Sequence, residues 1–586
     1  MSIASEILRL QNAKADLKTS IENKGVTVPT SAKLDEYSDY VDSIVAGIVV
    51  PTPWVRPSSW PDLSKMDVSG GDIVYMTSYA DEVRGFCDLY VYCTGSYTVE
   101  VGYISGSTFV AESTQSYPSA NRCQLYYGSI NGTYKVLRVT GNTITQFKLN
   151  STNSAITIGT FNCYNNNQGV IDIVGKLPSC SKIQAQNSYN VINISISGLK
   201  ISGSMSSAFS GCYSLKSLYV SDWNTSAVTN MSNMFSSCCS LSSLDVSNWD
   251  ISTVTNISSM FSGCYSLTLL DVSKWDTSAV TNMGSAFSSC NSLTLLDVSN
   301  WDTSSATSMT SMFSGCYSLT LLDVSDWDTS SVITMNTMFS NCTSLTSLDV
   351  SKWDTSSATN ISGIFSGCYS LTSLDVSNWD TSSVTNISSV FSNCNSLISI
   401  DVSKWDTSSA TNMSSIFYYC SSIPFLDVSS WDTSSATSMS SIFYGCYCLK
   451  SLDVSDWSTD IVTSMSSMFN SCYSLKHLDI SNWDMSSITN TNQMFYCCYS
   501  LYDSLIIPAT LTTIGSNTFY SNRSIYEWHF LSTTPPTLSS SNVFNYMSDF
   551  GGKKIYVPYS SDHSVLEAYK TATNWSTFAS YIQEEP

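Results

Sequence analysis

The stretch "LDVSDWDTSSVITMNTMFSNCTSLTSLDVSKWDTSSATNISGIFSGCYSLTSLDVSNWD", residues 322–380, states one sequence unit twice and begins it a third time. The tryptophans make the period measurable, because eleven of them, from Trp223 to Trp483, follow one another at intervals of 26 residues without an insertion. Columns of phenylalanine and cysteine keep the same interval. A fixed period of this length is typical of solenoids, in which each unit buries its apolar face against its neighbours. The array therefore predicts a core of stacked side-chain ladders.

One unit contains two different apolar patterns. From Ala306 to Cys316 the apolar residues fall on one helical stripe, which predicts a short helix. The pattern L-x-x-L-x-V from Leu319 to Val324 then predicts a short strand with its leucines turned inward. Trp327 closes that strand, and the D-T-S-S sequence after it predicts a turn whose Asp and Ser side chains bond to nearby backbone amides.

The unit L-D-V-S-x-W-D-T-S-x-V/A-T-x-M-x-x-M-F-x-x-C-x-S-L resembles the bacterial surface-protein repeat of the BspA-like leucine-rich-repeat class. Downstream, "IIPATLTTIGSNTFYSNRSIYEWHF" and "KKIYVPYSSDHSVLEAYKTATNW" resemble the related repeat and the ending of the same class. The resemblance implies a leucine-rich-repeat α/β solenoid at residues 196–503 and a C-terminal BspA-like cap at 504–586. Proteins of this class are implicated in adhesion to surfaces, other proteins or glycans, so the resemblance implies binding and no chemistry.

Near the N-terminus, apolar residues follow alternating steps of four and three, as in a heptad seam. These candidate oligomerisation residues are Ile3, Ile7, Leu10, Leu17 and Ile21. The segment "LKTSIENKGVTVPTSAKLDEYSDYVDSI", residues 17–44, resembles N-terminal segments of tailed-phage tail-fibre and related virion structural proteins. Residues 1–45 are therefore expected to dock onto virion tail proteins and to form a homo-oligomer, for instance a trimer. The simpler alternative is a helical hairpin packed on the next domain.

Between these parts, the sequence predicts a linker and a β-domain. Residues 46–69, which include "PTPWVRPSSWPDL", are proline-rich. Residues 70–195 carry alternating runs such as "DIVYMTSY" and "TYKVLRVTG" between turn residues, which predict a β-sandwich and a transition to the solenoid. This domain could be a carbohydrate-binding module or a structural adaptor. The predicted fold is thus multidomain α+β, with short N-terminal helices, a β-sandwich, a solenoid and a cap.

The charge balance restricts the partners. A formal net charge of -21 argues against nucleic acid and against an anionic membrane, since both select basic surfaces. No signal peptide is expected, because the N-terminal segment carries charges through its apolar positions. No stretch approaches the ~18 apolar residues that cross a bilayer. With the phage-like N-terminus, these observations predict a location in the virion, in the phage tail. The alternative location is the bacterial cell surface or the extracellular space.

Three columns of the array supply candidate receptor contacts: Tyr265, Tyr317, Tyr369, Trp301, Trp327, Trp353, Asp302, Asp328 and Asp354. The tyrosines suit an exposed amphipathic surface. The tryptophans could stack on sugar rings or pack inside the core. The aspartates could bind calcium or act as hydrogen-bonded turn caps on a solvated face. The cysteine column is expected to consist of buried free thiols, with disulfides and metal binding as the alternatives.

No catalytic signature supports an enzyme. The chain has three histidines and lacks G-x-S-x-G, H-E-x-x-H and P-loop patterns. We therefore expect no enzymatic activity, no cofactor and no metal. The predicted function is that of a phage tail-fibre or receptor-binding protein, whose solenoid attaches to a host cell-surface glycan or protein through many weak contacts. The alternatives are a bacterial cell-surface BspA-like adhesin and a surface-polysaccharide depolymerase.

Overall fold

The computed structural model describes residues 63, 66–69, 72–79, 85–105, 107–118, 121–127, 134–141, 143–149, 170–178, 180–188, 191–545 and 552–586. The chain splits into two compact units, Met1–Pro61 and Asp62–Pro586, and the described residues all belong to the second. The predicted helical segment 1–45, with its candidate oligomerisation residues Ile3 to Ile21, lies outside the described residues. Within the described part of the chain, no helix has the length and apolar character needed to cross a membrane.

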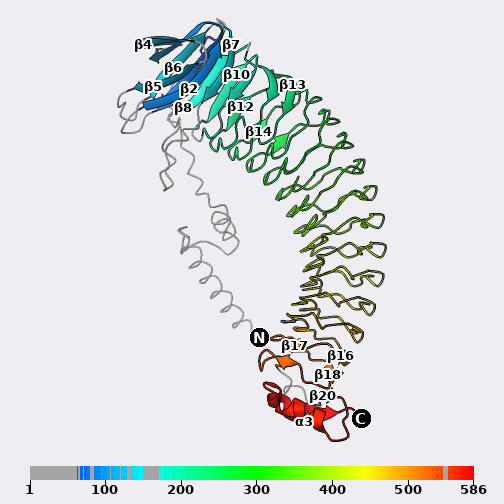
Figure 1. Ribbon diagram of the computed structural model, residues 1–586. Helices are drawn as coiled ribbons and strands as arrows, with labels where there is room; N and C mark the ends of the chain where they lie inside the picture. The colour runs from blue at the N-terminus through cyan, green and yellow to red at the C-terminus, as the bar shows by residue number, and fades with distance from the viewer. Residues whose placement is uncertain are drawn as a thin grey trace, which may run out of the picture. The chain divides into compact units, whose positions relative to one another are not determined.

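The second unit begins with β-strands (Figure 1). Their bounds are β1 Ile73–Tyr79, β2 Gly85–Cys93, β3 Ser96–Ser105, β4 Thr108–Pro118, β5 Asn121–Tyr127, β6 Tyr134–Gly141, β7 Ile144–Leu149, β8 Val170–Lys176 and β9 Lys182–Gln184. Alternate residues such as Tyr97, Val99 and Val101 in β3 are buried, which is the period of a strand with one face on a core.

These strands form two sheets, and the larger sheet runs into the solenoid. Its order is β12-β10-β8-β1-β6-β3-β4, and the second sheet has the order β5-β2-β7-β9. β1 pairs antiparallel with β6 and β8, whereas β10 (Asn193–Ser197) pairs parallel with β8 and with β12 (Ser217–Tyr219). The expectation of a separate β-sandwich domain at 70–195 is therefore not borne out, because parallel pairing from β8 onward joins these strands to the first coils.

The array itself is a parallel solenoid in which coil stacks on coil (Figure 1). Its early coils contain the short strands β11 Lys200–Ser204, β13 Asn224–Asn230, β14 Ser243–Leu244 and β15 Leu269–Leu270. Single parallel bridges at intervals of one repeat then link the coils, as between Asn256 and Asn282 and between Ser308 and Thr334. The predicted strand at Leu319–Val324 is thus reduced to one bridge, between Leu295 and Leu321. The predicted leucine-rich-repeat solenoid is confirmed.

The predicted helix from Ala306 to Cys316 does not form. The amides of Met309, Ser311 and Phe313 donate to carbonyls of the next coil at 2.8–2.9 Å, while those of Met312 and Ser314 donate back three residues at 3.2 and 3.1 Å. The segment is therefore a run of turns that shares its hydrogen bonds with its neighbour. A helix would direct the amides after its first turn to carbonyls within the segment, and the stack would lose most of these links between coils. The α+β expectation is corrected accordingly.

Stacked side chains fill the solenoid. The rings of Phe313 and Phe339 in successive coils lie 5.7 Å apart at 7°, and those of Trp301 and Trp327 lie 6.3 Å apart at 3°. The buried core continues without interruption from Val74 in β1 to Ile582 at the C-terminal end. Offset aromatic stacks of this kind add about 0.5–1.5 kcal/mol per pair beyond area burial. The ladder arrangement predicted from the 26-residue period is confirmed.

One column of the turn segment has a left-handed backbone in every coil. It contains Gly211, Ser237, Gly263, Ser289, Gly315, Asn341, Gly367, Asn393, Tyr419, Gly445, Ser471 and Cys497. Glycine alternates with a larger residue over much of this column. A Cβ on Gly367 would stand 2.3 Å from Oδ1 of Asn341 in the preceding coil. The side chain of one coil thus occupies the space that glycine leaves in the next, and the packing repeat spans two coils.

The C-terminal part closes the solenoid with smaller coils and a helix. Its elements are β16 Asp503–Ile507, β17 Thr513–Ile514, β18 Ile525–Phe530, β19 Thr537–Leu538, β20 Lys554–Val557, α3 Ser564–Thr571, the 3-10 helix η3 Trp575–Tyr581 and β21 Ile582–Glu584. Buried Tyr569 and Trp575 donate to the carbonyls of Ser532 and Pro536 at 2.9 and 2.7 Å. These aromatic groups cover the last coil with their polar atoms satisfied, so the core does not end on an open apolar face.

Candidate functional site

The tryptophan column faces the core. Trp301, Trp327 and Trp353 are 3, 3 and 2% exposed, and each indole Nε1 donates to a valine carbonyl of the preceding coil. For Trp327 that acceptor is Val298, at 3.1 Å. The expectation that these three tryptophans contact a receptor is wrong. A buried indole with its N–H satisfied stabilises every coil interface, and it leaves no ring face at the surface.

The aspartate columns form turns at the surface. Oδ1 of exposed Asp328 accepts hydrogen bonds from the backbone amide and the hydroxyl of Ser330, at 3.0 and 2.6 Å. The hydroxyl and the amide together hold the pKa of Asp328 below its usual value. Exposed Asp302 and Asp354 accept the amide of the second following residue in the same way. The predicted turn caps are confirmed, and receptor contact by these aspartates stays a prediction. No cluster of metal-ligating side chains lies within the described ranges.

The cysteine column is buried and unbridged. Sγ of Cys316, for example, donates to the carbonyl of Phe287 in the preceding coil at 3.1 Å. Burial raises the pKa of Cys316 to about 12. The prediction of buried free thiols is confirmed for this column. Such thiols are protonated at physiological pH and inaccessible, so they offer no nucleophile or metal ligand at the surface.

The predicted tyrosine contacts are exposed. Tyr265, Tyr317 and Tyr369 have exposed fractions of 37, 42 and 45%. They stand on alternate coils, and Asn291 and Thr343 occupy the same column in the coils between them. Each tyrosine follows a Gly-Cys pair, so these tyrosines recur every two coils, as the glycines of the left-handed column do. A phenol that is half exposed is placed for contact with a partner, and that role remains a prediction.

Sequence reasoning missed an apolar strip beside the tyrosines. Leu269, Leu295 and Leu321 are 66, 56 and 57% exposed in three successive coils. The L-x-x-L-x-V pattern predicts that Leu319 and Leu322 turn inward, and both are buried, but it says nothing of Leu321 beside them. The Leu-Leu doublet in L-T-L-L-D-V was the available signal, because consecutive residues of an extended segment point to opposite sides. We call the surface formed by the columns of Tyr317, Thr320 and Leu321 the strand face.

A second missed group lies at the C-terminal end of the strand face. Tyr447, Tyr473 and Tyr499 occupy the Tyr317 column in three successive coils, and their rings stack at 4.8 and 4.9 Å. The guanidinium of Arg523 lies 4.5 Å from the centroid of Tyr499. The sequence signal was the change from tyrosine on alternate coils to tyrosine on consecutive coils. This stack extends the column of tyrosines through the last three regular coils.

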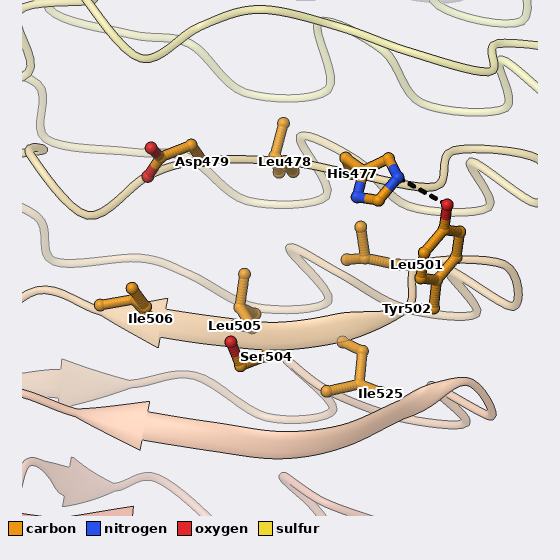
Figure 2. Close-up of a pocket in the computed structure, with 9 residues that line it drawn as sticks. All are labelled: His477, Leu478, Asp479, Leu501, Tyr502, Ser504, Leu505, Ile506 and Ile525. Atoms are coloured by element: carbon orange, nitrogen blue, oxygen red, sulfur yellow. Dashed lines mark hydrogen bonds between the residues drawn. The ribbon is translucent and has the colours of Figure 1, made fainter.

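A hollow of about 230 Å³ lies where the last regular coil meets β16, and Figure 2 shows the residues that line it. Its apolar lining comes from Leu478, Leu501, Leu505, Ile506 and Ile525. At one end, Nε2 of His477 is hydrogen bonded to the hydroxyl of Tyr502 at 2.6 Å, and Asp479 lies at the opposite end (Figure 2). Leu478 is only partly buried, unlike its equivalents in the array. The change of coil length at the cap thus opens a shallow site with polar groups at both ends.

These features define a class: a repeat-solenoid protein of the BspA-like leucine-rich-repeat type, with a buried aromatic ladder and an exposed strand face. The family model described as "Mycoplasma protein of unknown function, DUF285" matches residues 184–294, 262–372, 307–425, 345–447 and 420–510. These matches together cover more than half of the chain, so the protein belongs to that family. The matched part contains the whole 26-residue array, and it supports the BspA-like resemblance of that array.

No curated protein matches the chain. Among solved structures, a leucine-rich cell surface protein of Faecalibacterium prausnitzii A2-165 shares 17% identity with a TM-score of 0.27, over 64% of this chain and 91% of that one. The plant peptide hormone receptor RGFR1 in complex with RGF2 shares 13% identity with a TM-score of 0.19, over 67% of this chain and 70% of that one. Scores this low support no conclusion about what this chain binds.

Proposed function

We propose that the protein is an adhesin-type binding protein whose strand face attaches to a glycan or protein on a cell surface. The observation that carries the proposal is the row of half-exposed side chains on that face, with Leu269, Leu295 and Leu321 next to Tyr265 and Tyr317. Contiguous exposed apolar side chains on a folded protein mark interaction surfaces. The BspA-like class of the array agrees with this role, since its members are implicated in adhesion.

Repetition gives such a surface its strength. Parallel coils stack at about 4.8 Å, so equivalent side chains recur along the face at a short and regular spacing. Each contact can then be weak while the sum is strong, as long as the partner also repeats or is extended. This arrangement needs no deep pocket and no catalytic group, and we propose that the protein binds without catalysis. Release of reducing ends from a surface polysaccharide would contradict that and favour a depolymerase.

The strand face can be tested by removing its leucines. Ser347, Ser373 and Ser399 stand at the equivalent position in later coils, so the triple variant Leu269→Ser, Leu295→Ser, Leu321→Ser keeps a side chain that the coil accepts. The matched control is Ile333→Thr, which removes another exposed apolar side chain from a column that is otherwise threonine in the neighbouring coils. Binding of labelled protein to intact bacterial and epithelial cells should fall in the triple variant and persist in the control. Equal binding by both would refute the proposal.

A phage tail fibre is the second candidate, and one observation favours it. Residues 17–44 resemble N-terminal segments of tailed-phage tail-fibre and related virion proteins, and these residues lie outside the described part. If the resemblance reflects function, the full chain is an oligomer, and removal of residues 1–45 yields a monomer that binds cells more weakly. Light scattering on both forms tests this. A monomeric full chain that still binds cells would leave the cell-surface adhesin as the better proposal.

A further inference from the structure

Positive charge is scarce in the array and then gathers at one place. Residues 226–445 contain three lysines, Lys274, Lys352 and Lys404, and no arginine. The next coils place Lys450, Lys476, His477 and Arg523 at the surface, all of them exposed. In a chain with a net charge of -21, such a group stands out.

The two lysines are neighbours on the strand face. The amide of Lys476 donates to the carbonyl of Lys450 at 3.2 Å, and the amide of Tyr502 donates to the carbonyl of Lys476 at 3.1 Å, so the three residues form one column. The same column contains Thr268, Thr294, Thr320, Thr346 and Thr372 in the middle of the array. Neither lysine forms an ion pair with another residue of the described part. Nζ of Lys450 lies 5.5 Å from the ring centroid of Phe425, and the residue is exposed to solvent.

Aromatic and apolar groups border these cations. The stack of Tyr447, Tyr473 and Tyr499 lies at the start of the same extended segments and ends on Arg523. The hollow of Figure 2 lies between the last two of these coils, with His477 and Tyr502 at one end. We call Lys450, Lys476, His477, Tyr499, Tyr502 and Arg523 the basic end of the strand face.

We propose that the basic end of the strand face binds an acidic polysaccharide, in which carboxylate or sulfate groups recur along a chain of sugar rings. This inference rests on the proposed adhesin function and names the chemistry of its ligand. A sugar ring has apolar C–H faces that suit the floor formed by Leu478 and Leu505, and hydroxyls that can donate to Asp479. Its anionic groups would meet the ammonium groups of Lys450 and Lys476.

The arrangement discriminates between ligand classes. Oδ1 of Asp479 already accepts the amide and the hydroxyl of Ser481, at 2.9 and 2.7 Å, and the second oxygen of the exposed carboxylate is a further acceptor for the hydroxyl donors of a ligand. A bare anion has no such donors and would be repelled by this carboxylate. A neutral glycan has no anionic group that could pair with the ammonium groups of the two lysines. A long nucleic acid would pass from the basic end onto the aspartate columns of the preceding coils, where like charges oppose it.

The test uses the full chain and three polymers: heparin as a sulfated glycan, polygalacturonate as a carboxylated glycan and dextran as a neutral one. The variant Lys450→Thr, Lys476→Thr restores the residue found in the middle of the array. The control Lys274→Asn, Lys404→Asn makes the same change in charge, and asparagine stands at the equivalent positions 248, 300 and 378. Biolayer interferometry should show binding to at least one acidic polymer and none to dextran. We expect the first variant to bind roughly tenfold more weakly, as loss of two exposed charge contacts predicts.

Salt provides a second readout, because contacts between exposed charges weaken strongly at about 0.5 M ionic strength. Binding that is equal for dextran, unaffected by salt or reduced equally in both lysine variants would overturn the inference. If cell binding is lost in the leucine variant and kept in Lys450→Thr, Lys476→Thr, the proposed function stands and the inference fails. If the chain binds an acidic polymer but no intact cell, the inference stands and the adhesin function fails.

Discussion

Replacement of Gly367 by alanine tests the two-coil packing repeat directly. Gly367 has φ +76°, and its amide donates to the carbonyl of Ser392 in the next coil at 2.7 Å. An added Cβ would meet Asn341 of the preceding coil, with Oδ1 at 2.3 Å and Cγ at 3.1 Å. A contact under 3.0 Å cannot persist, so the Asn341 side chain or the coil must move. The substitution therefore carries a backbone cost and a packing cost.

The two costs can be estimated and separated. A left-handed backbone costs an L-residue roughly 1–2 kcal/mol, and forced repacking in a filled site adds about 1–3 kcal/mol. We expect Gly367→Ala to destabilise the protein by about 3 kcal/mol. Gly263→Ala is the matched control, since φ is +75° there and the nearest atoms of Ser237 lie 3.5 Å away. That control should show the backbone cost alone, about 1–2 kcal/mol. In the double variant Asn341→Ser, Gly367→Ala, the loss of stability should be close to that of Gly263→Ala.

The assay must report on single coils, because each coil contacts only its neighbours and the array need not unfold in one step. Hydrogen exchange followed by mass spectrometry measures the opening free energy of peptides that cover residues 339–370, and denaturant unfolding gives the global value. The reasoning predicts faster exchange around Asn341 and Gly367 in the single variant. Equal effects of Gly367→Ala and Gly263→Ala would refute it, because the Asn341 contact would then carry no energetic weight.

Three further predictions concern the ladders and the turns. Trp327→Phe removes the indole donor to the carbonyl of Val298, which keeps the amide of Trp301 as its other donor. The loss of this one hydrogen bond should cost about 0.5–1.5 kcal/mol in denaturant unfolding, whereas an unchanged midpoint would show that the bond is dispensable. In the native protein at pH 8, alkylation followed by peptide mapping should modify exposed Cys448 rapidly and buried Cys316 only after unfolding. Asp328 has a pKa below its unfolded value, so its contribution to stability is complete above that unfolded value and is lost as pH falls through the folded pKa. The midpoint of thermal unfolding should therefore fall less steeply with decreasing pH in Ser330→Ala than in the parent chain.

The solenoid and its core could be predicted from the sequence because they depend on periodicity alone. Trp327, Phe313 and Cys316 recur at one interval, and side chains in a parallel stack must then lie above one another. The local structure was harder to predict. The apolar stripe from Ala306 to Cys316 fits a helix. The segment forms a run of turns because its amides donate hydrogen bonds to carbonyls of the next coil, and the sequence of a single repeat does not reveal these bonds.

The surface could be predicted only in part, for a physical reason. Exposure of Tyr317 follows from its place next to the buried cysteine column, but exposure of Leu321 depends on which of two adjacent leucines turns inward. The hollow beside His477 depends on the change in coil length at the cap, which has no signature in the repeat itself. Pairing between coils thus decides features that composition and spacing leave open.

The positions at which the strand face departs from the repeat indicate where a ligand binds. A solenoid with identical coils would present the same surface on every coil. A partner could then bind, but all positions along the solenoid would bind it equally well. The core columns vary only among apolar residues, as from Met312 to Ile364 and Val390, and every coil from Trp223 to Trp483 keeps its tryptophan. The strand face does vary: threonine gives way to Lys450 and Lys476, and leucine and serine give way to His477. Because core packing tolerates either residue at an exposed position, packing does not account for this difference along the face. Selection by a ligand with distinct apolar and anionic parts would account for it.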